Sequence, residues 1–561
     1  MLFLRINFAD RNERCQFVFV GRGRRWPRRD RLLMLDWRAM PSGRQRPTRE
    51  ELIRQDIRDL QRLGYAQQLY REMGGFANFA ISFSIISILT GAIQLFGYGL
   101  QFAGPVINTV GWPLVSVFVL CVAASMAELA SAYPTAGGLY FWAFRLGGHR
   151  WAWVTAWFNM IGQVTITAGI DYAAAVYIVG ALNRIFEAHL PTHQGATIIA
   201  MVLLMIPQML INIFGIRLTA LLNDFSVWWH IGGVIVIAAV LMLFGTHTQP
   251  LAFLLHAVET VHPLDQAASF SIGPLSVDSL ILRVPGVREL YASGGIALGF
   301  VLGLLQAQWT YTGYDASAHV AEETVMARLN SAWGVFLSVA VSAVVGYGVL
   351  LVLTLHVPDI AATVDPANAP AVLYIAYTNL SAGLAHVVAI VIGVAMWLCG
   401  LSSITSMSRM WFAFARDGGM PLHTVIRRVH PRLRTPVWAI LITCTLAIVL
   451  TVYAALYSVV VALSTTALYL AYAIPIYLNL RNKLRHQGEY TTAVTAPWNL
   501  GRWGIVLNAI AVLWVAAITV LFSIPPNELA GWSIILLGVF LAAYWWFDAR
   551  HRFTGPQGTG C

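Results

Sequence analysis

Long apolar runs alternate with short polar stretches along most of the chain. Each run is about 20 residues long, which as a helix crosses the roughly 30 Å hydrocarbon core of a bilayer. The runs are too long and too uniformly apolar for transmembrane β-strands, which alternate over about ten residues. The pattern predicts an all-α polytopic membrane protein with about twelve transmembrane helices. The predicted spans start near Phe76, Gly111, Trp151, Ala196, Phe225, Gly294, Ser331, Ala382, Val437, Tyr457, Gly504 and Trp532.

The composition requires lipid around the chain. Of its 561 residues, 58% are hydrophobic and only 11% are charged. A single soluble core stops growing at roughly 250 to 300 residues, so one core cannot hide this much apolar surface. Membrane lipid is therefore an expected partner.

Basic residues gather in every second loop between the predicted spans. Short loops rich in Lys and Arg stay in the cytoplasm, so we expect both termini to be cytoplasmic. We also expect the protein to lie in the plasma (inner) membrane. The formal net charge of +10 follows from this asymmetry and from an Arg-rich amino terminus, so we expect no nucleic-acid partner. The basic loops contain Arg145 and Arg150, then Arg217, then Arg416, Arg427, Arg428, Arg432 and Arg434, and finally Arg481, Lys483, Arg485 and Arg502.

The regions outside the spans differ in character. Residues 1–50 are crowded with Arg and lack the apolar core of a secretory signal, so we expect a disordered cytoplasmic tail or an upstream start codon with initiation near Met40. Residues 51–75 have apolar positions at helical spacing and are expected to lie along the membrane surface. Residues 246–293 form a long external loop, and residues 550–561 a second cytoplasmic tail.

Two predicted spans are interrupted at corresponding places. Span 1 contains Thr90, Gly91 and Ala92, and span 6 contains Thr312-Gly313-Tyr314. Non-helical backbone at membrane depth is tolerated only where it faces protein or a water-filled cavity, and paired breaks indicate the binding site of an inverted-repeat transporter. The breaks open two five-span units, residues 76–245 and 294–480, and residues 481–549 add spans 11 and 12. Unwound backbone and half-helix ends suit a zwitterion.

A polar stripe runs along span 3. Asn159, Gln163, Thr167 and Asp171 recur at every fourth residue and so share one helix face. Ionisable residues inside a membrane usually mark ligand or ion pathways, which makes Gln163 and Asp171 candidate substrate contacts. The alternative is hydrogen bonding between helices.

Four segments resemble signatures of a known family. They are GGFANFAISFSIISILTGAI, SMAELASAYPTAGGLYFWAFRLGG, WTYTGYDASAHVAEET and SRMWFAFARDGGMP. In this order between spans, they are similar to those of the amino acid/choline transporter family within the amino acid-polyamine-organocation superfamily. The resemblance runs from about Glu72 to about Arg550. It implies a twelve-helix fold with a five-plus-five inverted repeat and secondary transport of amino acids or related amines.

The resemblance also implies roles for the two breaks. The span 1 break falls on Thr90, Gly91 and Ala92, whose backbone would meet the substrate carboxylate, although many relatives have more glycine here. Carbonyl groups near Thr312 and Gly313 would take the amino group. The remaining residues of the span 6 pattern, of which the first two would gate or stack on substrate, are Trp309, Tyr311, Tyr314 and Asp315.

A coupling ion is the only cofactor-like group expected. The resemblance suggests a coupling residue, because proton-coupled relatives often carry a Lys at the fifteenth residue of the segment that here reads IRLTALLNDFSVWWH, and that residue is His230. Histidine switches charge near pH 6.5, so His230 is the candidate proton carrier. Ser402 and Ser403 lie where sodium-coupled relatives place hydroxyl ligands, which keeps Na⁺ as an alternative. No phosphate-binding GxxxxGK[ST] motif is present, so ATP drive is not expected.

Opposite charges gather at the predicted cytoplasmic ends of several spans. They are either solvated loop charges or the parts of a cytoplasmic gate held shut by ion pairs. The carboxylates are Glu128, Glu322 and Glu323, and their candidate partners are Arg145, Arg409 and Arg416.

Other classes of protein lack support in the sequence. Neither an HExxH metal motif nor a nucleophile elbow is present, so we expect no enzyme and no metal site. A channel would need a continuous polar pore rather than two isolated breaks. Asp171 and Asp315 would favour γ-aminobutyrate, choline, a polyamine or a cationic amino acid if ionised in the cavity, and a neutral amino acid if not. The oligomeric state, a homo-oligomer included, stays open.

Overall fold

The computed structural model describes most of the chain after the amino-terminal region. The described residues are 47–267, 269–272, 275–453, 457–486 and 496–556, together with strands β1 (Leu4–Ile6) and β2 (Phe17–Phe19). Most of the predicted tail 1–50, and the end of the predicted tail 550–561, lie outside them. The chain divides into the units Met1–Gln55 and Asp56–Cys561. In the first, β1 and β2 pair antiparallel; the second contains all the apolar helices.

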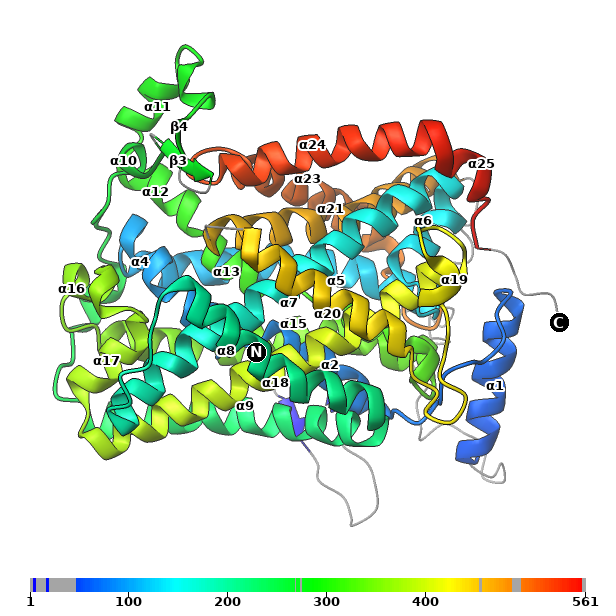
Figure 1. The fold of residues 1–561 in the computed structure, drawn as a ribbon, viewed down its shortest axis with the longest axis horizontal. Coiled ribbons are helices and arrows are strands. Elements are labelled where there is room, and N and C mark those ends of the chain that lie inside the picture. Colours follow the sequence, from blue (N-terminus) through cyan, green and yellow to red (C-terminus); the bar gives the residue numbers. More distant parts are fainter. Residues whose placement is uncertain are drawn as a thin grey trace, which may run out of the picture. The chain divides into compact units, whose positions relative to one another are not determined.

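The second unit is a bundle of long helices (Figure 1). The helices up to the long loop are α2 (Gly75–Ile86), α3 (Gly91–Gln94), α4 (Phe96–Ala103), α5 (Trp112–Ala132), α6 (Leu139–Gly147), α7 (His149–Phe186), α8 (Gln194–Phe214) and α9 (Ile216–Phe244). Those after it are α12 (Gly295–Gly303), α13 (Leu305–Thr310), α14 (Ala316–His319), α15 (Ala327–Leu355), α16 (Ile360–Val364), α17 (Ala371–Asn379), α18 (Ala382–Arg416), α19 (His423–Ile426), α20 (Val437–Tyr453), α21 (Tyr457–Arg485), α23 (Gly504–Leu521) and α24 (Glu528–Tyr544).

The helices have the length and composition of membrane spans. Ten of those described are long and apolar enough to cross a bilayer, and an eleventh is added if the pair Val287–Ser293 and Gly295–Thr310, bent by 100°, counts as one span. Val437–Val452 is a shorter apolar helix. The prediction of an all-α polytopic membrane protein is confirmed, while the count of twelve stays a prediction.

One span begins earlier than the apolar pattern predicts. The fifth was expected near Phe225, but α9 starts at Ile216. The polar residues Asn223 and Asp224 made its first turns look like a loop. Asn223 is buried and donates to the Thr219 carbonyl at 2.8 Å, while Ser402 on α18 donates to its side-chain oxygen. Helix α9 tolerates Asn223 because a neighbouring helix supplies a hydrogen-bond partner for its side chain.

Burial differs strongly between the inner and outer helices. Helix α7 packs against α6, α8, α18, α20 and α21, and most of its length is buried. Helices α9 and α24, along opposite edges of the bundle in Figure 1, instead expose large apolar side chains such as Leu221 and Leu536. Exposed apolar surface of this extent marks contact with lipid or a partner.

The long loop is attached to one end of the bundle. Besides short helices it contains a two-stranded ladder of β3 (Ser269–Ile272) and β4 (Leu275–Asp278). Its backbone is tied to spans 1 and 2, because Val258 N donates to Ala103 O at 3.2 Å and Thr109 Oγ1 donates to Leu254 O at 2.6 Å. The segment is thus fixed against the ends of two spans.

A buried ion pair joins α5 to α21. Glu128 was expected to pair with Arg145, Arg409 or Arg416, but its carboxylate contacts the Lys483 ammonium. It also accepts from Asn479 Nδ2 at 3.0 Å and from Leu500 N at 3.1 Å. The prediction was wrong because α21 continues as a helix to Arg485, which carries Lys483 inward instead of leaving it in a solvated loop.

We expect Glu128→Ala to lower the free energy of unfolding by about 3–5 kcal/mol, because Lys483 would remain buried without its partner. The thermal unfolding midpoint of the purified protein measures this loss, and replacing both residues by Met should recover much of it.

A matched control is Asp548→Ala. The Asp548–Arg552 pair is substantially exposed, so its loss should change stability by less than about 1 kcal/mol. Equal midpoints for Glu128→Ala and the wild type would refute the stabilising role of the buried pair.

Candidate functional site

The two interrupted spans meet inside the bundle. Helix α2 ends at Ile86, and Ser87 adopts a left-handed conformation with φ 31° before α3 begins. Helix α13 ends at Thr310, and Gly313 has φ +84° before α14 begins. The Ser82 hydroxyl donates to the Tyr314 carbonyl at 2.8 Å, which ties the second break to α2.

The first break lies slightly earlier than expected. The unwound residues begin at Ser87, whereas Gly91 and Ala92 already belong to α3. Gly91 serves close packing instead, because a Cβ there would lie 2.7 Å from Thr310 Oγ1. Glycine marks the expected break, but Ser87, held by the Thr90 hydroxyl and the His230 imidazole, supplies the observed one.

A small cavity lies between the breaks and has room for at most about one water molecule. Thr90, Gly91, Trp309 and Thr312 are predicted substrate contacts that line it, whereas Ala92 is buried and is not among the lining residues. The other lining residues are Ile85, Ile86, Ile166, Ile170 and Thr310. Uncharged side chains therefore form the whole wall of the cavity.

Tyr311 is turned away from the cavity. Its hydroxyl lies 2.6 Å from Ser116 Oγ, and its ring centroid lies 4.8 Å from that of Trp112. Its carbonyl accepts from the Tyr469 hydroxyl at 2.6 Å. Trp309 is the aromatic residue of the span 6 pattern that reaches the cavity wall.

Asp315 is the centre of a polar network beneath the break. One carboxylate oxygen, Oδ2, accepts from Asn159 and Gln163 on α7, each at 3.0 Å, and lies 3.0 Å from His319 Nε2. The other, Oδ1, accepts from the Tyr472 hydroxyl at 2.8 Å. Asp315 and Gln163 are thus committed to protein partners and are not among the residues lining the cavity.

Two members of this network were missed by sequence reasoning. His319 stands four residues after Asp315, the spacing that brings side chains together on a helix, and this was the available signal. Tyr472 on α21 is far away in sequence, and nothing near it indicates its partner. Its hydroxyl also accepts from Gly313 N at 3.2 Å, so it holds the broken backbone.

Asp171 also lies away from the cavity. It accepts from Gln208 Nε2 on α8 at 3.0 Å, and its Oδ2 atom has no hydrogen-bond partner among the described residues. A Cβ on Gly400 would lie 2.2 Å from its Oδ1 atom. Helix α18 therefore packs directly over this carboxyl group.

His230 is fully buried and contacts the first break. Its Nδ1 atom lies 2.7 Å from the Ser226 carbonyl, and its Nε2 atom lies 2.7 Å from Ser87 Oγ. Ser87 Oγ in turn lies 2.6 Å from Thr90 Oγ1. A chain of three polar groups therefore leads from the imidazole to the cavity wall.

Ser402 and Ser403 point to different helices. The Ser402 hydroxyl donates to Asn223 on α9, whereas Ser403 Oγ lies 2.6 Å from Thr167 Oγ1 on α7. The two hydroxyl groups do not converge on one ion position.

A buried charge cluster lies at the far end of the broken span 6. Glu322 accepts two hydrogen bonds from Arg416, at 2.9 and 3.0 Å, and Glu323 accepts from Arg409 at 3.3 Å. All four side chains are at most 5% exposed, so these are buried pairs rather than solvated loop charges. Arg145 instead lies over the Tyr133 ring, 6.0 Å from its centroid.

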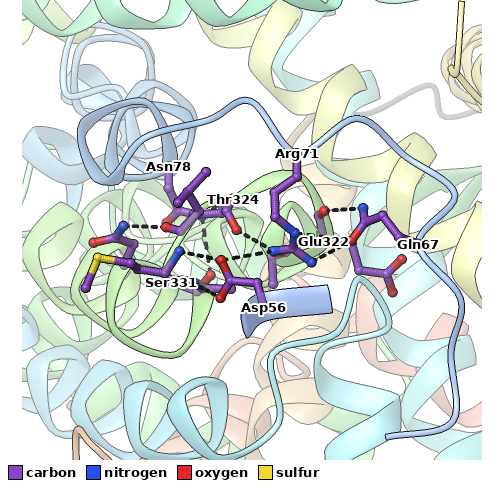
Figure 2. A network of polar contacts seen from close by, with 12 residues as sticks. Asp56, Gln67, Arg71, Asn78, Glu322, Thr324 and Ser331 are labelled. Carbon is purple, nitrogen blue, oxygen red and sulfur yellow. Dashed lines mark hydrogen bonds and ion pairs between the residues drawn. The ribbon is translucent and has the colours of Figure 1, made fainter. Parts of the chain in front are cut away.

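The segment before span 1 clamps this cluster (Figure 2). Arg71 donates to the carbonyl groups of Ala321 and Thr324, and Gln67 donates to the Glu322 carbonyl at 2.8 Å. Asp56 accepts from Met326 N at 2.7 Å. From Asp56 onward, the segment predicted to lie on the membrane surface is thus held by protein contacts.

Burial shifts the pKa values of two charged groups in this segment. It raises the pKa of Asp56, an effect that Arg71 at 4.0 Å only partly offsets, and it lowers the pKa of Arg71. Both changes reflect the cost of keeping a charge away from water.

Two interrupted helices that meet at a buried cavity are typical of secondary transporters. Fold and site therefore place the protein in the class of multi-span helical transporters. The model of a family described as amino acid permease matches residues 73–545, and the chain belongs to this family. The resemblance predicted from the four sequence segments is confirmed, and the protein is an amino acid transporter rather than an enzyme.

Relatives cover most of the chain. Amino-acid permease BAT1 of Arabidopsis thaliana is 35% identical over 533 residues, which are 89% of this chain and 95% of the relative. The amino-acid permease BAT1 homolog of Oryza sativa subsp. japonica is 34% identical, over 89% of this chain and 94% of the relative. The GABA-specific permease of Saccharomyces cerevisiae is 27% identical, over 70% and 65%.

Gly313→Ala should abolish most uptake. Its φ of +84° disfavours any side chain, and a Cβ would lie 2.2 Å from Ile85 Cγ2. We expect overpacking and strain to cost about 1–3 kcal/mol each. Gly348→Ala on α15 is the control, because a Cβ there meets nothing within 4 Å. Equal uptake by both variants would contradict the importance of the second break.

Proposed function

We propose that this protein imports an amino acid across the plasma membrane by alternating access, driven by a proton gradient, with both termini in the cytoplasm. The observation that carries the proposal is the buried cavity between the two breaks. A substrate held there is reached from one side of the membrane at a time.

Backbone groups of the first break suit a carboxylate. The amide groups of Thr90 and Gly91 both donate to the Ser87 carbonyl, at 2.8 and 2.9 Å. One carbonyl therefore accepts from two donors, and a substrate carboxylate would take over at least one of them. At the second break, carbonyl groups near Thr312 and Gly313 would accept from the substrate amino group.

The cavity wall favours an amino acid with a neutral side chain. Four isoleucines and Trp309 supply apolar surface, and no lining residue is charged. A second ammonium group would be desolvated without a partner, which is costly. A relative is called a GABA-specific permease, so γ-aminobutyrate, choline and polyamines remain the alternative substrates to test.

His230 is the proposed proton carrier. As a neutral ring it donates from Nδ1 to the Ser226 carbonyl and accepts at Nε2 from the Ser87 hydroxyl, while Thr90 donates to Ser87. Once protonated, His230 donates to Ser87, whose hydroxyl then donates to Thr90. The Thr90 hydroxyl is then free to donate into the cavity, so a proton on His230 strengthens the site for a carboxylate.

The buried charge cluster is the proposed cytoplasmic gate. The pairs Glu322–Arg416 and Glu323–Arg409 join the end of span 6 to α18. They have to separate when the site opens inward. Membrane potential assists import, since one charge moved through 100 mV is worth about 2.3 kcal/mol, enough to concentrate a neutral substrate roughly 50-fold.

Uptake of radiolabelled compounds into proteoliposomes tests this function. The panel contains neutral and cationic amino acids, γ-aminobutyrate, choline and polyamines, with imposed proton or sodium gradients. We expect proton-driven accumulation of a neutral amino acid by the wild type. His230→Ala should lose accumulation and retain counterflow, and Ser87→Ala should weaken the coupling.

The control is His386→Ala, a half-buried histidine whose ring lies beside Tyr377, and it should accumulate substrate like the wild type. Sodium-driven uptake that is indifferent to His230→Ala would contradict proton coupling and favour Ser402 and Ser403. Failure of every compound in both accumulation and counterflow would overturn the proposed function.

A further inference from the structure

A single residue connects the second break with the charge cluster. Ala136 lies between α5 and α6 and is buried. Its N–H group donates to Glu322 Oε1 at 3.1 Å, and its carbonyl oxygen lies 3.1 Å from His319 Nδ1. Glu322 is the partner of Arg416. His319, Ala136 and the ion pair thus form one continuous chain of contacts.

The contacts of His319 require an additional proton. Its Nδ1 atom faces a carbonyl oxygen, which only accepts, so Nδ1 carries hydrogen. Its Nε2 atom faces Asp315 Oδ2 at 3.0 Å. A neutral imidazole has one N–H donor, and an ionised carboxylate has no hydrogen-bond donor. Both contacts are hydrogen bonds only when one proton is shared by the His319–Asp315 pair.

The other neighbours of the pair do not supply this proton. The amide groups of Asn159 and Gln163 donate to the same Oδ2 atom, and the Tyr472 hydroxyl donates to Oδ1. Helix α14 also packs against α2, α15 and α18. On these elements, uncharged Asn78, Ser82 and Gly334 lie next to α14, and Asn78 donates to Ser331. The charged residues are committed elsewhere: Arg409 and Arg416 of α18 are paired with Glu323 and Glu322, and Arg328 of α15 donates to the Ser131 carbonyl.

We propose that the His319–Asp315 pair is a proton-binding site separate from His230. A proton bound at this site holds the gate shut through Ala136. Loss of the proton leaves a neutral ring with one N–H group. If the hydrogen stays on Nε2, the bare Nδ1 atom faces the Ala136 carbonyl and the contact is lost. If it stays on Nδ1, the bare Nε2 atom faces the carboxylate of Asp315.

Either arrangement loosens the closed state. The first frees Ala136, and with it the hydrogen bond that positions Glu322 for Arg416. The second sets two lone pairs against each other inside the broken span. Only the description of the cluster as a gate rests on the proposed function; the proton site itself follows from the contacts of His319.

Hydrogen–deuterium exchange of the purified full-length protein tests the proposal without substrate or ion gradient. Exchange in peptides covering residues 133–138 is compared from about pH 5.5 to about pH 9, across the ordinary range of histidine, after correction for intrinsic rates. We expect exchange in the wild type to rise by about tenfold in one pH-dependent step. His319→Gln should lose the step, because its amide can donate to Ala136 and does not titrate.

Two further variants make the test specific. His230→Gln is the matched buried control and should keep the step. Asp315→Asn should move the midpoint of the step, because the carboxylate that shares the proton with His319 is gone. If His319→Gln does not fold, Asp315→Asn decides alone.

A wild type without the step, a step that persists in His319→Gln, or an unmoved midpoint in Asp315→Asn would overturn the proposal. Because exchange needs no transport, a normal step in a protein that accumulates nothing would instead count against the proposed function and leave the proton site standing.

Discussion

Unwound backbone inside a membrane must find new hydrogen-bond partners, and the described bundle is arranged around this requirement. The second break shows it most clearly. The Tyr311 carbonyl accepts from Tyr469, the Tyr314 carbonyl accepts from Ser82, and the Gly313 amide donates to Tyr472. Tyrosines of α21 and a serine of α2 thereby fix where span 6 breaks. The cavity exists because these partners hold the two broken spans together.

Buried charges need partners in the same way as unwound backbone does. Among the described residues, the buried carboxylates of span 6 are paired, Asp315 with His319, Glu322 with Arg416 and Glu323 with Arg409. Pairs of this kind favour one arrangement strongly, since separating them exposes a charge to apolar surroundings. The pair Glu128–Lys483 joins α5 and α21, and no hydrogen bond or ion pair among the described residues links it to span 6. It is therefore separate from the pairs of the proposed gate.

The local sequence pattern predicted much of the fold, and side-chain contacts between distant helices account for the features it did not predict. Runs of apolar residues predicted the polytopic helical fold, and polar interruptions predicted both breaks to within a few residues. Charges at one end of the spans gave an ion-paired gate as one of two alternatives, without assigning a partner to Glu322 or Glu323. The sequence could not reveal that Ser87 rather than Gly91 unwinds the first span, or that Lys483 turns inward to Glu128. Each depends on side chains from helices more than a hundred residues away.

Substrate binding between the two breaks can be observed in a structure of the protein determined with a saturating amino acid, chosen by counterflow. We expect the ligand between the unwound residues of span 1 and Trp309 to Gly313, with the cavity enlarged and the ligand carboxylate on the amide groups near Thr90. A ligand bound elsewhere, with both breaks and the cavity unchanged, would rule out this binding site.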